Sequence, residues 1–288
     1  MLISDEQLEG FKETVWERGK EFYRDLPWRD TVDPYAILVS EVMLQQTQVS
    51  RVLGRWEEWL STFPTVQSLA EAPLPPVLGL WQGMGYNRRA INLKRCAEEV
   101  VARYGGAIPR DYGELVALPG IGPATASGVR AFAFRLPGIY LETNVRTVFI
   151  HELFPEVEQV SDKDLVPLVE ATCPGEDARA GRDVRSWYYA LLDYGAHLKK
   201  TQANPSRRSK EYTRQTAFEG SNRQKRAFLL RRVLEDPASA EELVEDLNAA
   251  ERRAGRGELE REQVEAILEQ LAAEGFIEKE NGYWTCRD

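Results

Sequence analysis

The sequence has little cysteine and no long apolar run. Its three cysteines, Cys96, Cys173 and Cys286, are scattered, so they offer neither a disulfide framework nor the spacing of a metal site. No apolar stretch is long enough to span a bilayer, and the N-terminus lacks the basic-then-apolar pattern of a signal peptide. We therefore expect a cytoplasmic protein in a reducing compartment, without membrane association.

The sequence is also short of positive charge, with a net charge of -9 that is unevenly distributed. Between Lys199 and Arg232 there are eleven Lys and Arg residues against two acidic ones. From Val233 onward the balance reverses, with sixteen acidic residues against six basic ones. A basic stripe of this kind suits phosphate groups, whereas the acidic tail disfavours them.

Strand signals are absent before the tail, and the apolar spacing is helical almost throughout. A length of 288 residues suggests about two domains. Residues 199–222 are polar and predict an exposed connector, and Asn281-Gly282 between two short apolar runs predicts a terminal β-hairpin. Helices are predicted near residues 2–25, 34–43, 56–63, 77–81, 88–104, 124–134, 144–151, 187–198, 228–234, 240–247 and 262–274.

One turn is distinctive, because two glycines and a proline lie close together before a predicted helix. Gly120 and Gly122 allow a tight hairpin, and Pro123 suits the first turn of a helix. The outward amides of such a turn can bind phosphate. On this motif alone, a purely structural turn is an equally good interpretation.

Five motifs together resemble the helix-hairpin-helix DNA glycosylase superfamily, and most closely its adenine glycosylase (MutY) branch. The resemblance covers residues 26–196. Its motifs, in order, are Leu26-Pro27-Trp28-Arg29, the run from Ser40 to Val49, Gly83-Met84-Gly85-Tyr86, the hairpin from Leu118 to Ala126, and Glu142-Thr143-Asn144-Val145-Arg146.

The resemblance implies an all-α, two-lobed body with DNA across the cleft, followed by a small winged-helix-like α+β domain. One six-helix lobe would span about 30–140, and the second would combine 1–29 with 141–200. The connector would be 201–222 and the winged-helix-like domain 223–288. The implied reaction is hydrolysis of the N-glycosidic bond of a base flipped out of duplex DNA.

Two carboxyl groups are the candidate catalytic groups. Glu41 has apolar neighbours that should raise its pKa, and it matches the residue that protonates the leaving base in the resembled enzymes. Glu142 stands where the superfamily has aspartate, beside C1′ of the sugar, with Asn144 supporting the loop. The alternatives are an ordinary exposed helix glutamate for Glu41 and a helix cap for Glu142.

Ala124 occupies the position where bifunctional relatives carry a lysine nucleophile. Alanine cannot form a Schiff base, so the resemblance implies a monofunctional enzyme without lyase activity. Lys199 or Lys200 could in principle replace the lysine, although nothing in their spacing supports this.

The family resemblance implies further residues that contact DNA. Trp28, Arg29 and Leu44 match positions at the flipped base, Gln45 and Gln46 match a wedge, and Tyr86 matches a minor-groove loop. A core tryptophan, surface glutamines and a buried tyrosine are the alternatives. The remaining expected DNA contacts are Gly120, Gly122, Ala124, Thr125, Lys199, Lys200, Arg207 and Arg208, and the carbonyls of Leu118, Gly120 and Ile121 could hold K⁺ or Na⁺.

Two features of the resembled family are missing. The chain lacks the four cysteines that follow Asp193-Tyr194-Gly195-Ala196 in relatives with a 4Fe-4S cluster, so no cluster and no other cofactor is expected. The tail does not resemble the Nudix-like domain that reads 8-oxoguanine in adenine glycosylases.

We therefore predict a monofunctional DNA glycosylase, with adenine opposite guanine or 8-oxoguanine as the first substrate. A mismatched or damaged pyrimidine is the alternative substrate, and a catalytically weak lesion-binding protein is the alternative function. The expected partner is lesion-containing duplex DNA at the nucleoid, with a protein partner for the acidic tail as a further option. A monomer is expected.

Overall fold

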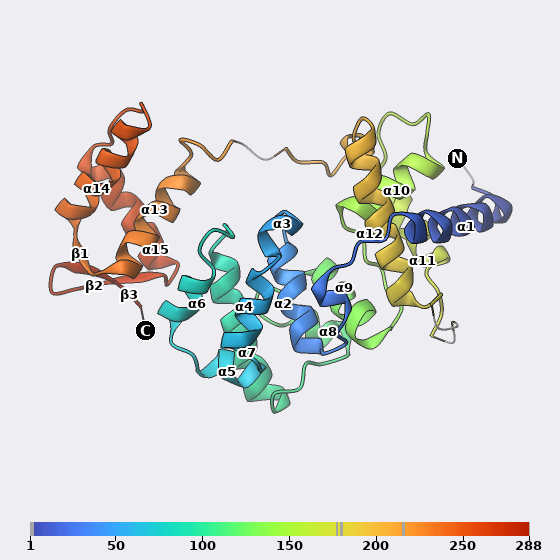
Figure 1. Ribbon diagram of the computed structural model, residues 1–288, viewed down its shortest axis with the longest axis horizontal. Helices are drawn as coiled ribbons and strands as arrows, with labels where there is room; N and C mark the ends of the chain where they lie inside the picture. Colours follow the sequence, from blue (N-terminus) through green and yellow to red (C-terminus); the bar gives the residue numbers. More distant parts are fainter. Residues whose placement is uncertain (1–2, 177, 179–180, 215–216, 288) are drawn as a thin grey trace. The chain divides into compact units, whose positions relative to one another are not determined.

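The computed structural model describes residues 3–176, 178, 181–214 and 217–287, and most of them are helical (Figure 1). The chain forms two compact units. The first combines residues 1–42 with 108–214, and the second combines 43–107 with 215–288. Helix α2 (Pro34–Leu44) passes from the first unit to the second.

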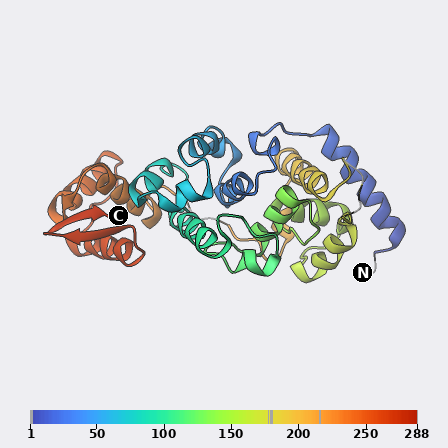
Figure 2. The same cartoon turned by 90° about the horizontal axis from the view of Figure 1, so that it is seen from below.

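The first unit is organised around helix α12 (Val184–Thr201), which packs against α1 (Asp5–Glu21), α9 (Pro123–Phe134) and α10 (Thr143–Leu153). Figure 2 shows α1 running beside α12. Gly19 makes this approach possible, because a Cβ there would lie 2.2 Å from the Cβ of Ala190. The other elements of the unit are η1 (Pro27–Arg29), α8 (Tyr112–Val116), α11 (Asp162–Thr172) and η2 (Pro205–Arg208).

The sequence of α1 explains both its start and its buried face. Ser4 and Gln7 form a capping box that satisfies the first backbone amides of the helix. Phe11, Val15 and Gly19 follow at four-residue spacing and are buried, so one stripe of the helix faces the core.

The second unit begins with a layer of helices around α7 (Arg88–Tyr104). Its bounds are those that the apolar spacing predicts, and Gly105 ends it in the left-handed conformation at φ 61°. Helices α5 (Val66–Glu71) and α6 (Leu74–Leu80) pack on α7, and α3 (Val49–Val52) and α4 (Arg55–Thr62) complete the layer.

The C-terminal part of the second unit has the element order of a winged helix. Its elements are α13 (Asn222–Glu235), β1 (Ala238–Ser239), α14 (Ala240–Arg253), α15 (Arg261–Ala273), β2 (Ile277–Glu280) and β3 (Tyr283–Cys286). The strands form an antiparallel sheet in the order β1-β3-β2, which Figure 2 shows beside the helices. The predicted hairpin is confirmed, since Asn281 and Gly282 take φ values of 50° and 88° between β2 and β3.

The expectation of an exposed connector is wrong for three residues of the segment 205–209, in which Arg207 remains exposed. Pro205, Ser206 and Ser209 are buried, and η2 packs on α10. The cause is Arg208, whose guanidinium donates to the carbonyls of Ile150, Phe154 and Val157. These contacts satisfy the end of α10, a role that the charge of this stretch could not reveal. The predicted domain boundaries at residues 200 and 222 stay a prediction.

A buried ion pair fastens the segment after α1 to α12. Asp193 is 1 % exposed, and its carboxylate accepts from Arg29 at 2.7 and 2.8 Å and from Nε of Arg24 at 2.6 Å. Arg185 adds bonds to the carbonyls of Arg29 and Thr31 at 2.8 and 2.7 Å. This network holds the loop that leads into α2.

We expect Asp193→Ala to lower the free energy of unfolding by about 3–5 kcal/mol, because it leaves a buried arginine without its counter-ion. Urea unfolding measures the loss. The matched control is Glu21→Ala, which removes an exposed pair with Arg18 and should leave the midpoint almost unchanged. Equal midpoints for the two variants would contradict the anchoring role of Asp193.

Candidate functional site

Glu41 lies on α2, with its carboxyl group against α9 of the first unit. A Cβ on Gly128 would lie 2.1 Å from Oε2 of Glu41, so the glycine makes room for the carboxyl. Burial is the main cause that raises the pKa of Glu41, to about 8, and the charge of Glu142 raises it further. Glu41 therefore carries its proton at neutral pH.

Tyr140 is a residue of this site that the sequence analysis missed. Its phenol donates a hydrogen bond to Glu41, and its side chain is only 7 % exposed. The ring is fixed edge-on against Phe132 and Tyr188, each at 5.3 Å between ring centroids. Burial raises the pKa of Tyr140 well above its ordinary value, so the phenol stays a donor. No motif marks this position, because the contact exists only in the tertiary structure.

Glu142 is the N-cap of α10. Its Oε1 accepts from the amides of Asn144 and Val145 at 2.7 and 3.2 Å. Burial raises the pKa of Glu142, while the Asn144 amide and the charge of Lys199 act in the opposite direction. The cap and a chemical role are compatible, because the cap holds the carboxylate by one of its two oxygens.

Lys199 lies beside this loop, which its spacing in the sequence did not predict. Its Nζ donates to Oδ1 of Asn144 at 3.2 Å. Helix α12 reaches the loop because Gly195 has no side chain, and a Cβ there would lie 2.2 Å from the carbonyl oxygen of Asn144. The first unit thus brings together Glu41, Glu142, Asn144 and Lys199. Lys200 is exposed at the end of α12, and Arg207 is exposed in η2.

Trp28 and Arg29 are both buried, at 3 % and 8 % exposure. The guanidinium of Arg29 is bound to Asp193 and stacks on Tyr189, with its Cζ 4.3 Å from the ring centroid. The structure thus gives Arg29 an anchoring role, and contact of either residue with a base stays a prediction.

The hairpin joins α8 to α9. Gly120 takes the left-handed φ of 75°, which explains the glycine, and the amide of Ile121 donates to the carbonyl of Leu118 at 3.2 Å. Gly122 is the N-cap of α9, so the cap residue places no side chain over the first amides of the helix. Ala124 is exposed there and Thr125 is buried, while the carbonyl site for K⁺ or Na⁺ stays a prediction.

Two loops of the second unit carry Gln46 and Tyr86. Both residues have positive φ, 53° and 50°, a conformation that costs energy for a side chain other than glycine. Tyr86 is 38 % exposed, Leu44 is half-buried at the end of α2, and Gln45 is half-buried in the loop that follows it. Such strain often persists at positions that bind a ligand.

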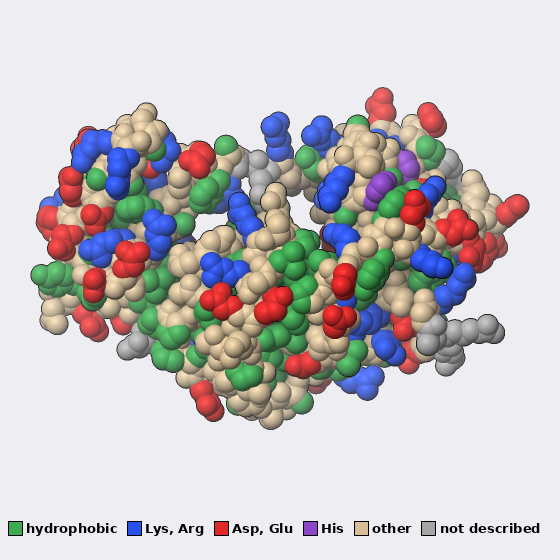
Figure 3. Space-filling model, viewed as in Figure 1, with side chains coloured by type: hydrophobic (Ala, Val, Ile, Leu, Met, Phe, Trp, Pro, Cys, Tyr) green, Lys and Arg blue, Asp and Glu red, His purple; other side chains and the backbone are tan. Residues whose placement is uncertain are grey.

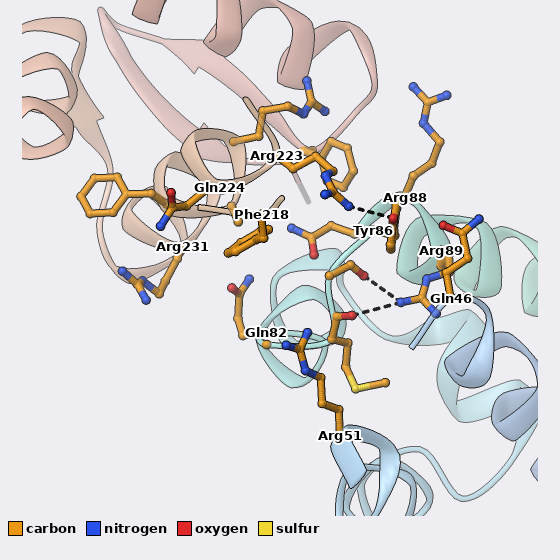
Figure 4. A pocket seen from close by; sticks show the side chains of 18 of the residues that line it. Gln46, Arg51, Gln82, Tyr86, Arg88, Arg89, Phe218, Arg223, Gln224 and Arg231 are labelled. Atoms are coloured by element: carbon orange, nitrogen blue, oxygen red, sulfur yellow. Dashed lines mark hydrogen bonds between the residues drawn. The ribbon is translucent and has the colours of Figure 1, made fainter. Parts of the chain in front are cut away.

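Arg89 holds the two loops together, and it was also missed by the sequence analysis. Its buried guanidinium donates to the carbonyls of Met43 and Gln45 at 2.9 and 2.7 Å, and to that of Gly85 at 2.9 Å. Figure 4 shows Arg89 together with Gln46 and Tyr86 of the two loops. Burial lowers its pKa to about 10, so Arg89 remains charged at neutral pH. It is a positioning residue for Gln46 and Tyr86.

Two negative findings apply to the described ranges. Residues 3–176, 178, 181–214 and 217–287 contain no group of three or more His, Cys, Asp or Glu side chains arranged to hold a metal ion. Within the same ranges, no helix combines the length and apolar character needed to cross a membrane.

Residues 39–170 match the model of the HhH-GPD superfamily of base excision DNA repair proteins, so this part of the chain is similar to that superfamily. The chain is also similar to adenine DNA glycosylases. That of Mycobacterium tuberculosis is 45% identical over 127 residues, which are 44% of this chain and 42% of the relative. That of Mycolicibacterium smegmatis is 42% identical over 174 residues, 60% of this chain and 58% of the relative. The chain thus spans about half the length of these relatives.

A solved structure of a thermostable thymine-DNA glycosylase shares the fold, with a TM-score of 0.60 and 25% identity. The similarity covers 70% of this chain and 91% of that protein.

The raised pKa of Glu41 predicts a specific effect of pH on stability. Between pH 4.5 and about 8 the folded protein holds this proton more tightly than the unfolded chain, so stability falls as pH rises through that window. Glu41→Gln removes the titration, and its advantage over wild type should grow with pH to on the order of a few kcal/mol. Urea unfolding across this pH range measures it. Glu170→Gln, exposed on α11, is the control; parallel curves for all three proteins would contradict the prediction.

Proposed function

We propose that this protein is a monofunctional DNA glycosylase that releases a base flipped out of duplex DNA, with adenine as the first substrate. One observation carries the proposal. Burial raises the pKa of two neighbouring carboxyl groups, Glu41 and Glu142, to about 8 for Glu41, but Glu142 accepts backbone amide bonds and lies near the charge of Lys199, which both act to lower its pKa. Such a pair can supply a general acid and a negative charge at the same pH.

In the proposed mechanism, Glu41 donates its proton to a ring nitrogen of the departing base, and Tyr140 fixes the orientation of the carboxyl. Breaking the N-glycosidic bond makes the sugar cationic. The carboxylate of Glu142 stabilises this charge, either electrostatically or by bonding to C1′, until water completes the hydrolysis. The backbone amides of Asn144 and Val145 hold that carboxylate in place, and with the charge of Lys199 they favour its charged form against the effect of burial.

The choice of adenine rests on the names of the relatives and on Glu41, to which the motif resemblance assigns protonation of the departing base. A mismatched thymine is the second candidate, since the solved thymine-DNA glycosylase has the same fold at 25% identity. Lesion-containing duplex DNA is the proposed partner, and the exposed hairpin at Gly120 and the loops of Gln46 and Tyr86 are its proposed contacts.

The proposal of a monofunctional enzyme rests on Ala124, which offers no nucleophile. Lys199 is the amine that most needs testing, because it lies at the loop of Glu142. We assign it an electrostatic role, since it donates to Asn144.

Single-turnover incubation with duplexes carrying adenine opposite guanine, adenine opposite 8-oxoguanine, thymine opposite guanine, or uracil tests the function. We expect base loss from an adenine duplex, visible as strand scission only after alkali. Glu41→Gln should reduce the rate by at least about a hundredfold, the usual contribution of a general acid. Scission without alkali that disappears in Lys199→Ala would refute the monofunctional assignment. Tight binding without release from any duplex would favour a lesion-binding protein.

Gly128 provides a second test that leaves both carboxyl groups in place. Gly128→Ala puts a methyl group where Oε2 of Glu41 lies, at 2.1 Å, so the carboxyl must move. A displacement of about 1 Å can cost on the order of a hundredfold in rate. Gly138→Ala is the matched control, because its nearest side-chain atom would be 3.5 Å away. Equal single-turnover rates in both variants would contradict the assigned position of Glu41.

A further inference from the structure

The second unit contains a large open cavity whose arginines have no part in the proposed reaction, although two loops already proposed as DNA contacts border it. Its volume is about 1260 Å³, and it is bordered by the loops of Gln46 and Tyr86 and by α13 (Figure 4). We call it the arginine cavity, because its lining includes one carboxylate, Glu274, against the six arginines Arg51, Arg88, Arg89, Arg223, Arg226 and Arg231.

The winged-helix-like region contributes half of these arginines from one helix. On α13, Arg223 donates to the hydroxyl of Tyr86 at 2.8 Å, and its guanidinium lies over the same ring. Arg226 shares the carboxylate of Glu274 with Arg88, at 2.8 and 3.0 Å, so two cations face one anion. Arg231 is exposed. The cavity therefore keeps an excess of positive charge.

The face that a winged helix ordinarily offers to DNA has the opposite charge here. Helix α15 stands in the position of the recognition helix and carries Glu262, Glu265 and Glu269 against one basic residue, Arg261. The β2–β3 hairpin adds Glu278 and Glu280 against Lys279, so this face keeps a net negative charge. Phosphates would be repelled from this face and attracted to the side of α13 that lines the cavity. Figure 3 shows that acidic and basic side chains both occur on the surface of the C-terminal region.

The other lining groups suit a nucleotide. Tyr86 and Phe218 expose 38 % and 49 % of their surfaces, and both line the cavity. Aromatic rings of this kind stack on unpaired bases, while guanidinium groups bind phosphates and glutamine amides bind base edges. Gln45, Gln46 and Gln82 supply such amides.

We propose that the arginine cavity binds a segment of a DNA strand, with phosphates on Arg223 and Arg231 and an unstacked base against Tyr86 or Phe218. The winged-helix-like region is then part of the DNA-binding surface, through α13 and not through α15. This inference rests on the proposed function for the identity of the ligand as DNA. It adds a binding site in the second unit to the carboxyl groups of the first.

Fluorescence anisotropy of a labelled duplex that carries a tetrahydrofuran abasic-site analogue tests the inference, because this probe cannot be processed by base release. In a salt titration, Arg223→Ala/Arg231→Ala should lower the slope of log Kd against log salt by about one to two, as expected for two lost phosphate contacts. Phe218→Ala should weaken binding by about fivefold with the slope unchanged, because stacking releases no counter-ions. Arg253→Ala, an exposed arginine of α14 outside the cavity, is the control and should change neither quantity.

A wild-type slope in the double variant would overturn the inference, and it would leave the proposed function intact if the same protein preparation still releases a base. Conversely, a reduced slope without base release from any duplex would support the cavity and refute the glycosylase. Should the double variant melt at a lower temperature, Arg231→Glu at its exposed position should still reduce the slope. An unchanged slope there would also overturn the inference.

Discussion

The chemistry of this protein depends on the contact between Glu41 and the backbone of α9 at Gly128. Because the helix presents no side chain there, the carboxyl enters a site poor in water, and its pKa rises to about 8. Tyr140 forms a hydrogen bond with this carboxyl group, and the charge of the nearby Glu142 raises its pKa. A methyl group on residue 128 would remove this arrangement without altering either acid.

The rest of the first unit holds these groups in place. Helix α12 packs closely against the Glu142 loop at its own Gly195 and against α1 at Gly19 of that helix. Its Asp193 also accepts hydrogen bonds from both Arg24 and Arg29. One helix thus positions the acid, the carboxylate and the lysine beside it. In the second unit Arg89 has the corresponding role, since it fastens the two strained loops that carry Gln46 and Tyr86.

Local signals predicted most of the helices and the terminal hairpin. The 88–104 helix followed from its apolar spacing and from the glycines that end it, and Asn281-Gly282 marked the turn. Helix α11 was not predicted, and it carries Pro167 inside it. Strand β1 has only two residues and exists through its pairing with β3. The burial of Pro205, Ser206 and Ser209 depends on carbonyls some fifty residues away, at the end of α10, to which Arg208 donates.

The sequence by itself determined the helical class, the Gly120 turn, the family resemblance and the two carboxyl groups, because each depends on residue type and near spacing. Only the tertiary structure decided what surrounds them. Tyr140, Lys199 and Arg89 carry no motif, yet packing brings each to the group that it assists. The direction of a pKa shift likewise comes from burial and from charges distant in the chain, which no local pattern records.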